Sequence, residues 1–343
     1  MTSEELSRDE IALYDRQIRL WGIATQLRLR SARLLLINLG SVGMEAVKNL
    51  VLGGVNSIEL MDNSTIKSED YGAQFFLPKD DSKIGELKLP NVVDSIKELN
   101  DRVEININTK SFDTVIQGDP SYFKKFDLII ATEIQKPDTF KLNELTRELN
   151  LPLYIAGTHG MFGYIITDLI DNINETEKDM GNQPRKANTK LNLNKTIIKV
   201  ESNESTNKEL ITIHDSYRPI KEIFSSKLLP EQLNKRQLKR LSPSLPLIFA
   251  LFELQRVSDI NAETLKSHAL KACEELGVNP DIITDEYLKL FVDQGFTEFA
   301  PTSAILGGCL AQDIIQFLSK KESPINNVLI FDGLRSEMPI YTL

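Results

Sequence analysis

Residues 34–62 have the sequence LLLINLGSVGMEAVKNLVLGGVNSIELMD. The stretch begins with a strand-like apolar run, Leu34–Ile37, and a glycine turn, Asn38–Gly43. A helix-like run follows at Met44–Leu52, and Gly53 and Gly54 would end the helix. A second strand, Ile58–Met61, leads to an acid, Asp62. This order predicts a βαβ unit with parallel strands and a right-handed crossover.

The same alternation continues toward the C-terminus. Further strands are predicted at Val103–Ile107, Leu128–Ala131, Leu153–Ala156 and Val328–Phe331, and helices at Val92–Leu99, Phe140–Leu149, Glu231–Leu241, Leu245–Val257, Ala262–Leu276, Pro280–Val292 and Ser303–Leu318. For the helix at Pro280, Asn279 is the predicted cap. Strands that alternate with helices indicate an α/β fold, a Rossmann-like, doubly wound and mostly parallel sheet with helical additions.

One part of the chain departs from this pattern. Residues 171–209 are rich in Asn, Lys, Glu and Thr, with one β-like run at Thr196–Val200, and we interpret them as a small polar insertion with a flexible loop. We therefore divide the chain into three parts. Residues 1–170 form the first part of the α/β domain, 171–213 the insertion, and 214–343 a helical segment with the rest of the domain.

Composition and charge exclude several classes of protein. The 343 residues carry 40 Lys and Arg against 49 Asp and Glu, a formal net charge of -9, which argues against general affinity for nucleic acid or for an anionic membrane. The chain shows neither a signal-peptide pattern nor a run of about eighteen apolar residues. We expect a soluble protein of the cytosol or nucleus, without nucleic-acid or membrane partners.

Cysteine and histidine offer little chemistry. Cys273 and Cys309 are too few for a disulfide framework or a four-cysteine zinc site, and both lie in apolar helical runs without a cation nearby in sequence. We expect them to be small buried hydrophobic residues. His159, His214 and His268 lack metal-ligand spacing, so we predict no metal site.

The glycine turn is the first candidate site. Gly40 and Gly43 stand at the second and third glycine positions of a nucleotide-binding turn, and Asp62 stands where an acid would hold a ribose. The first position is Asn38, whose side chain would enter the space that a nucleotide needs. The turn alone leaves two alternatives open, a working nucleotide site or a turn kept for packing.

Arg16 is the second candidate. Ser7 and Glu10 have the spacing of a capping box, and the helix that follows would place Ile11, Tyr14, Ile18 and Trp21 on one face. Arg16 would project elsewhere. An arginine on a surface helix is ordinarily only solvated, but this planar, permanently charged group could also reach the phosphates of a neighbouring site.

Several ordered motifs resemble the ubiquitin-activating superfamily, which shares the adenylation fold of the bacterial ThiF and MoeB proteins. Within it, the resemblance is to the smaller, non-thioester-forming subunits of SUMO-activating enzymes. The motifs are Tyr14–Gly22, Asn38–Gly43 with Met44-Glu45, Tyr71–Phe75, Ala156–Gly160, Glu298–Pro301, Gly307-Gly308 with Ala311–Asp313, Asn326-Asn327 and Phe331–Gly333.

Departures from the active members of the superfamily imply that this chain's own adenylation site is degenerate. Asn38 interrupts the glycine turn, and Gly72 and Ala73 replace an Asn and an Arg that hold ATP. The aspartate that would hold magnesium is replaced by Ile134. Asp62 and Lys88 survive as site residues. The resemblance thus implies a pseudo-adenylation domain without cofactor or metal of its own and inactive alone.

The resemblance also implies a partner. The catalytic subunit of a heterodimeric SUMO-activating enzyme would bind Mg-ATP, adenylate the C-terminus of SUMO and capture it as a thioester, before a SUMO-conjugating enzyme receives it. This chain would contribute Arg16 in trans to the ATP phosphates, in the nucleus and cytoplasm. Three alternatives stay open. They are the regulatory subunit of the NEDD8-activating enzyme, a self-sufficient homodimeric adenylating or dinucleotide-dependent enzyme, and a purely structural interaction protein.

Overall fold

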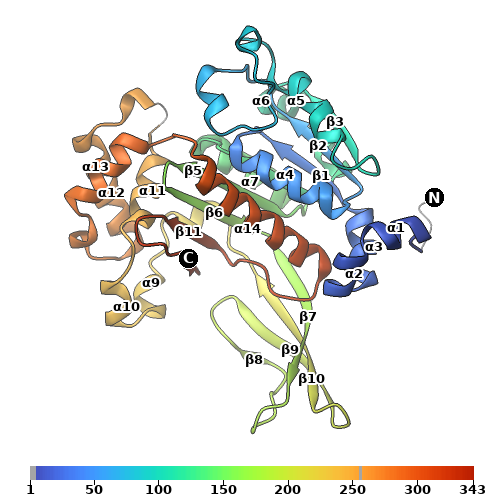
Figure 1. The fold of residues 1–343 in the computed structure, drawn as a ribbon. Helices are drawn as coiled ribbons and strands as arrows, with labels where there is room; N and C mark the ends of the chain where they lie inside the picture. Colours follow the sequence, from blue (N-terminus) through green and yellow to red (C-terminus); the bar gives the residue numbers. More distant parts are fainter. Residues whose placement is uncertain (1–4, 255–256) are drawn as a thin grey trace.

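A computed structural model describes residues 5–254 and 257–343 (Figure 1). Its central sheet has eight strands in the order β12-β11-β6-β5-β4-β1-β2-β3. The strands are β1 (Arg33–Ile37), β2 (Ser57–Met61), β3 (Glu104–Asn108), β4 (Leu128–Thr132), β5 (Leu153–His159), β6 (Phe162–Asp168), β11 (Val328–Asp332) and β12 (Ile340–Tyr341). The five strands from β3 to β5 are parallel, whereas β6, β11 and β12 pair antiparallel, so the predicted mostly parallel sheet is confirmed.

The βαβ unit forms as predicted. Helix α4 (Ser41–Gly53) begins three residues before the expected start and ends at Gly54, which takes the left-handed conformation of a helix C-cap. Strand β1 alternates its side chains between two cores. Leu34 and Leu36 belong to one core, and Leu35 and Ile37 to the other.

Helices cover both faces of the sheet. One core packs under α4, α5 (Lys88–Lys97) and α14 (Ala300–Ser319). The other core packs under five helices, α7 (Lys136–Glu148), α8 (Ile220–Ile223), α11 (Ser244–Leu251), α12 (Ala262–Leu276) and α13 (Asp285–Gln294). Helices α4 and α14 cross closely at Gly307, where a Cβ atom would lie 2.4 Å from Cβ of Glu45. This crossing places the start of α14 beside the glycine turn.

Some predicted helix limits were wrong. The expected helix at 231–241 is two short helices, α9 (Leu229–Gln232) and α10 (Lys235–Lys239), and the expected end of the next helix at Val257 lies beyond α11. Asn279 caps only a short 3-10 helix, Pro280–Ile282, whereas α13 starts at Asp285 with Thr284 as its cap. Helix α6 (Phe112–Gly118) and strands β6 and β12 were not predicted.

The polar insertion is mostly β-structure and projects from the body (Figure 1). Its strands are β7 (Asp171–Asp179), β8 (Thr189–Lys190), β9 (Lys195–Asn203) and β10 (Lys208–Ser216), in the antiparallel order β7-β10-β9-β8. The predicted polar insertion with β-structure is thus confirmed, with four strands in place of the single expected run, and its flexible loop stays a prediction. Ile197, Ile211 and Ile213 form a small core of their own, and ion pairs such as Lys208–Glu177 join neighbouring strands, which explains how so polar a sequence forms a sheet. The division of the chain at 170 and 213 stays a prediction.

No helix in the described part of the chain is long and apolar enough to span a membrane.

Candidate functional site

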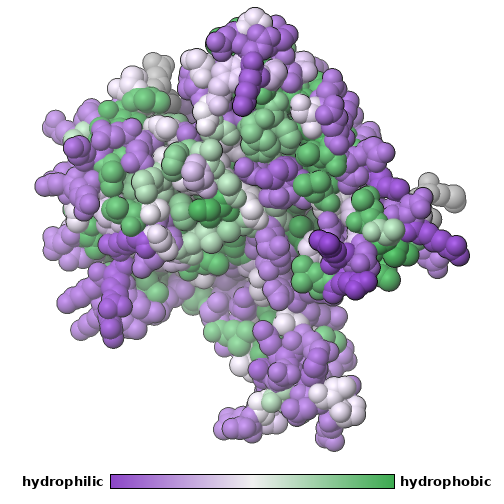
Figure 2. All heavy atoms as spheres, in the orientation of Figure 1, coloured by the Kyte–Doolittle hydropathy of each residue, from purple (hydrophilic) through white to green (hydrophobic). Residues whose placement is uncertain are grey.

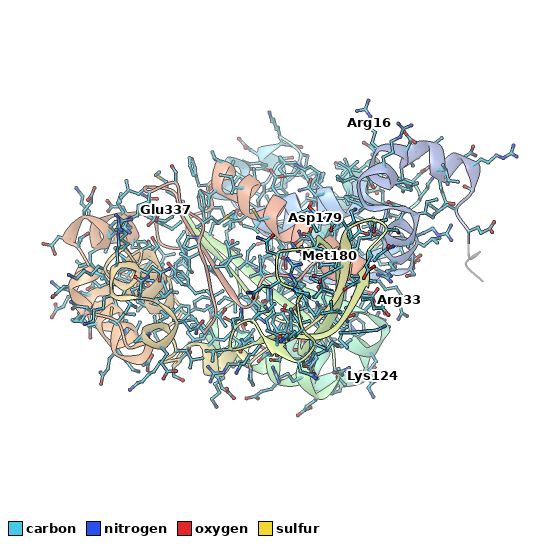
Figure 3. The ribbon with its side chains drawn as sticks, turned by 90° about the horizontal axis from the view of Figure 1, so that it is seen from below. Arg16, Arg33, Lys124, Asp179, Met180 and Glu337 are labelled. Atoms are coloured by element: carbon cyan, nitrogen blue, oxygen red, sulfur yellow. The ribbon has the colours of Figure 1, made fainter. Side chains whose placement is uncertain are left out.

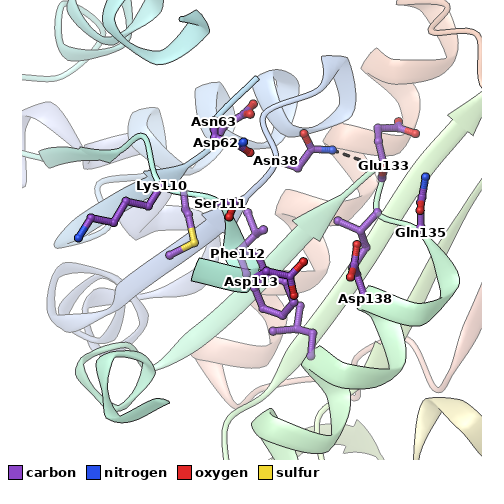
Figure 4. A pocket seen from close by; sticks show the side chains of 14 residues that line it. Asn38, Asp62, Asn63, Lys110, Ser111, Phe112, Asp113, Glu133, Gln135 and Asp138 are labelled. Carbon is purple, nitrogen blue, oxygen red and sulfur yellow. Dashed lines mark hydrogen bonds between the residues drawn. The ribbon is translucent and has the colours of Figure 1, made fainter. Parts of the chain in front are cut away.

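The glycine turn and Asp62 meet at one edge of the sheet, where β1, β2 and β4 end. A cavity of about 370 Å³ opens there (Figure 4). Its walls include Asn38 after β1, Asp62 after β2, and Glu133 and Ile134 after β4. Ligands of doubly wound α/β folds bind at this edge, so a nucleotide site of this chain would lie here.

Asn38 ties the turn to the neighbouring strand. It has a left-handed backbone, with φ of 62°, and its side-chain amide donates to the carbonyl oxygens of Thr132 at 2.7 Å and Glu133 at 3.3 Å (Figure 4). In return, the Thr132 hydroxyl donates to the carbonyl oxygen of Asn38. The Asn38 side chain thus helps to hold β1 to β4.

Asp62 is buried and hydrogen-bonded to the backbone through both carboxylate oxygens. Its Oδ2 accepts from the backbone nitrogen of Leu39 at 2.9 Å, and its Oδ1 accepts from that of Ser64 at 2.7 Å. Each oxygen therefore already has a partner within the chain. Asp62 therefore shapes the turn by joining residues 39 and 64.

Lys88 is buried at the start of α5 and is also engaged. Its Nζ lies 3.7 Å from Oδ2 of Asp70 and 3.4 Å from the carbonyl oxygen of Leu39. The paired carboxylate neutralises the lysine, which leaves little positive charge for a phosphate. Gly72 and Ala73, which follow Asp70 closely in sequence, have no charged side chain that could help to bind a phosphate.

The two glycines of the turn allow close packing. A Cβ atom on Gly40 would lie 2.7 Å from Oε1 of Glu298 and 2.9 Å from Cγ of Glu133. One on Gly43 would lie 3.0 Å from Oγ1 of Thr132. These contacts favour the alternative in which the turn is kept for packing.

Glu298 is the residue of this site that the sequence did not assign. It lies just before α14, and its Oε1 accepts from the backbone nitrogen of Ser41 at 2.7 Å, at the N-terminus of α4. Its Oε2 accepts from Nε2 of Gln74 at 2.8 Å. The only available signal was the resemblance motif that begins at Glu298, and it indicated no contact with the turn.

Glu133 is a second half-buried acid, beside Glu298. Burial, and then the Glu298 carboxylate, raise the pKa of the Glu133 carboxyl well above its usual range. Its Oε1 accepts from the backbone nitrogen of Thr158 at 3.0 Å. A group with this pKa shift carries its proton far more readily than an ordinary glutamate does.

The cavity as a whole is acidic. Four acids line it, Asp62, Asp113, Glu133 and Asp138, against one lysine, Lys110 (Figure 4). Burial, and then Asp113, raise the pKa of Asp138, which indicates that negative charge is already unfavourable there. A triphosphate would meet repulsion in this cavity.

Arg16 lies away from this cavity, on the short helix α2 (Asp15–Trp21). Its side chain is exposed and points outward from the N-terminal helices (Figure 3). Within the part of the chain that the structure describes, it makes no hydrogen bond, ion pair or ring contact. Arg19, on the same helix, is paired with Asp15 at 2.9 Å. Of the two arginines on α2, Arg16 is therefore the one without a partner in the described residues.

The N-terminal segment differs from the single predicted helix. The capping box of Ser7 and Glu10 is confirmed, but the segment divides into α1 (Arg8–Leu13), α2 and α3 (Ile23–Ser31). Tyr14 is buried at the first junction, whereas Ile11 on the predicted apolar face is exposed. Leu13 and Leu20, 57% and 78% exposed, lie close to Arg16 in sequence. Arg16 therefore stands on a segment with uncovered apolar side chains.

The cysteines and histidines play no part in the cavity. Cys273 is buried, as predicted, and burial raises the pKa of its thiol to about 11, whereas Cys309 is only half-buried. Burial lowers the pKa of His159 to about 3. Among residues 5–254 and 257–343, no group of three or more His, Cys, Asp or Glu side chains could hold a metal ion.

This fold, with a glycine turn between β1 and α4 and a site at the strand ends, matches a known family. The ThiF family pattern covers residues 14–343, and the chain belongs to the ThiF family.

Several known proteins are similar to this chain over nearly their full length. The chain is 41% identical to the DNA damage tolerance protein RHC31 of Saccharomyces cerevisiae, over 99% of both chains. It is 31% identical to the DNA damage tolerance protein rad31 of Schizosaccharomyces pombe, over the whole of both chains, and 28% identical to SUMO-activating enzyme subunit 1 of Homo sapiens, over 96% of this chain and 94% of that protein.

A solved structure supports the fold. The crystal structure of Escherichia coli MccB with MccA-N7isoASN matches with a TM-score of 0.54 at 13% identity, covering 99% of this chain and 73% of that one.

Proposed function

We propose that this chain is the smaller subunit of a heterodimeric SUMO-activating enzyme, one that does not form the thioester. Its full-length similarity to proteins named SUMO-activating enzyme subunit 1 supports this assignment. By itself the chain would be inactive. The catalytic partner subunit would bind Mg-ATP, form the SUMO adenylate and then the thioester, and pass SUMO to a conjugating enzyme, in the nucleus and cytoplasm.

One contrast in the structure carries the proposal. The chain's own cavity is lined by four acids and one lysine, Lys110, and the nearby Lys88 is already paired. Arg16, in contrast, is exposed and has no partner in the described residues. An adenylation site must stabilise phosphate charge, and preorganised positive groups contribute most of that stabilisation. In the chain's own cavity four acids outnumber one lysine, whereas the surface of the chain offers an unpaired arginine to a neighbour.

Arg16 would act at the phosphates of the partner's ATP. Mg-ATP bound there would supply the adenylyl group, since the C-terminal carboxylate of SUMO would attack the α-phosphorus and pyrophosphate would leave. The Arg16 guanidinium would donate to oxygens of the α-phosphate or of the departing pyrophosphate, where negative charge increases during the reaction. Because its charge is permanent and its fork is planar, no change of protonation is needed.

The surface around Arg16 is suited to a partner subunit. Leu13, Leu20 and Ile23 are all more than half exposed on the N-terminal helices. A second group of exposed apolar residues, Ile305, Met338 and Ile340, belongs to α14 and the C-terminal strand region, where Figure 2 shows green spheres on the face that carries α14. Exposed apolar groups of this kind are typical of protein–protein interfaces.

Pyrophosphate exchange by the reconstituted heterodimer tests the proposal. With SUMO and Mg-ATP, Arg16→Ala should leave the heterodimer intact but slow exchange by about 10²–10³-fold, as expected for loss of one charge-stabilising donor. Arg19→Ala is the matched control, since Arg19 lies on the same helix but is paired with Asp15. Equal rates for Arg16→Ala and the wild type would remove Arg16 from the mechanism.

The modifier must be tested as well. Thioester formation should occur with SUMO and not with NEDD8 when the two are assayed side by side. Thioester formation with NEDD8 alone would favour the regulatory subunit of the NEDD8-activating enzyme instead.

A further inference from the structure

The N-terminus of α4 is capped by a residue far away in sequence. Gly40 holds the N-cap position and has no side chain to accept from the first free N–H groups of the helix. Glu298 fills that role, with Oε1 2.7 Å from the backbone nitrogen of Ser41. A carboxylate here interacts favourably with the positive end of the helix dipole, at the place where Rossmann-type folds bind phosphate.

The Glu298 carboxylate is fixed from its other side too. Gln74, which is buried, donates through Nε2 to Oε2 of Glu298 at 2.8 Å and to Oδ1 of Asp70 at 3.1 Å. Asp70 in turn pairs with Lys88. These contacts join the start of α14, the segment around residue 74 and the start of α5. The Glu298 carboxylate is therefore held in place from both sides.

The space beside the turn is filled as well. The position of a Cβ atom on Gly40 is within 3 Å of both Glu298 Oε1 and Glu133 Cγ. A phosphate oxygen that approached the backbone nitrogen of Ser41 would need the position of Glu298 Oε1. It would also meet the negative charge of the carboxylate.

We infer that Glu298 is an internal substitute for a nucleotide phosphate. Its carboxylate occupies the anion-binding end of α4, excludes phosphate groups from that helix end, and holds the start of α14 against the glycine turn. The inference deepens the proposed function, since it gives one residue the role of keeping the chain's own site idle. It concerns anion binding by this chain, whereas the proposed function concerns Arg16.

The test is a calorimetric titration of the isolated chain with sodium pyrophosphate at constant ionic strength. The wild type should bind pyrophosphate only weakly. Glu298→Ala should bind pyrophosphate at least about tenfold more tightly than the wild type, the factor expected when an anion can reach a helix N-terminus. In a ¹⁵N-labelled Glu298→Ala chain, pyrophosphate should shift the amide resonances of Leu39 and Ser41, which places the anion at this turn.

Two further variants complete the design. Glu298→Gln has nearly the same shape and can still accept from Ser41, so it should fold and show weaker gains in pyrophosphate binding, even if Glu298→Ala does not fold. Glu144→Ala removes an exposed surface glutamate on α7 and should behave as the wild type.

The outcomes separate the two claims. If Glu298→Gln and a folded Glu298→Ala both bind pyrophosphate no better than the wild type, or bind it without shifting Ser41, the internal-anion inference is overturned. If the wild type itself binds Mg-ATP at micromolar concentration, the proposed function fails, because the chain's own site would then accept nucleotide.

Discussion

The Oε1 atom of Glu298 lies 2.7 Å from the backbone nitrogen of Ser41, although 257 residues separate them. This hydrogen bond places a carboxylate where nucleotide-binding relatives of this fold would place a phosphate. The same oxygen lies 2.7 Å from the position that a Cβ atom on Gly40 would take. One contact therefore explains both why residue 40 is a glycine and why the cavity beside it is unsuited to nucleotides.

Gly40→Ala should destabilise the chain through this contact. Gly40 has an ordinary φ of -83°, so the cost arises from collision with Glu298 and Glu133 and not from backbone strain. We expect a loss of about 1–3 kcal/mol in the free energy of unfolding, measured by denaturant titration. In the Glu298→Ala background the loss should fall by at least about 0.5 kcal/mol.

Gly43→Ala is the control for this double-mutant cycle. Its added methyl group would meet Thr132 and Leu36, so its cost should be the same with and without Glu298. Strict additivity for Gly40 and Glu298 would contradict the contact.

Glu133→Gln should change the pH dependence of stability. Because burial raises the pKa of Glu133 above the ordinary value of 4.5, the folded chain holds this proton where the unfolded chain has lost it. The stability of the wild type therefore falls as pH rises from about 4.5 through the raised pKa. Relative to the wild type, Glu133→Gln should gain stability over that range, by at most about 1.4 kcal/mol per pH unit.

The measurement is denaturant unfolding of both proteins at a series of pH values from 4.5 upward. His159, whose pKa burial lowers to about 3, is present in both proteins, and its contribution cancels in the difference. A stability difference that does not vary with pH would show that Glu133 titrates normally.

Tyr14 should control how firmly the Arg16 helix is held. Its hydroxyl accepts from Nδ2 of Asn100 at 2.9 Å, and its ring packs on Gly54, where a Cβ atom would lie 2.6 Å from the ring. Tyr14→Ala should cost about 3 kcal/mol or more, increase hydrogen exchange of residues 8–31, and slow pyrophosphate exchange by the heterodimer.

Tyr14→Phe is the matched variant. It removes only the hydrogen bond from Asn100, at a cost of about 1 kcal/mol, and should leave the exchange rate of the heterodimer nearly unchanged. If Tyr14→Ala also left that rate unchanged, placement of Arg16 by this anchor would be disproved.

The sequence predicted those parts of the fold that depend on local pattern. The alternation in β1, with Leu34 and Leu36 toward one core and Leu35 and Ile37 toward the other, is fixed by strand geometry, and the end of α4 at Gly54 by the left-handed conformation. The left-handed backbone of Asn38 was likewise foreseeable from its residue type.

Other features depend on contacts distant in sequence. The strands of the polar insertion are stabilised by cross-strand pairs such as Lys208–Glu177, which no single segment reveals. Glu298 reaches Ser41 only because α14 crosses α4 at Gly307. The exposure of Ile11 also contradicts its predicted apolar face, since the helix breaks at Tyr14 and only the tyrosine is buried.

Pyrophosphate exchange by the isolated chain, with Mg-ATP and SUMO present, tests the central claim most directly. We predict no exchange above background until the catalytic partner subunit is added, because this chain's cavity is mostly acidic and Glu298 occupies the N-terminus of α4 at the glycine turn. SUMO-dependent exchange by the purified chain alone would contradict the account.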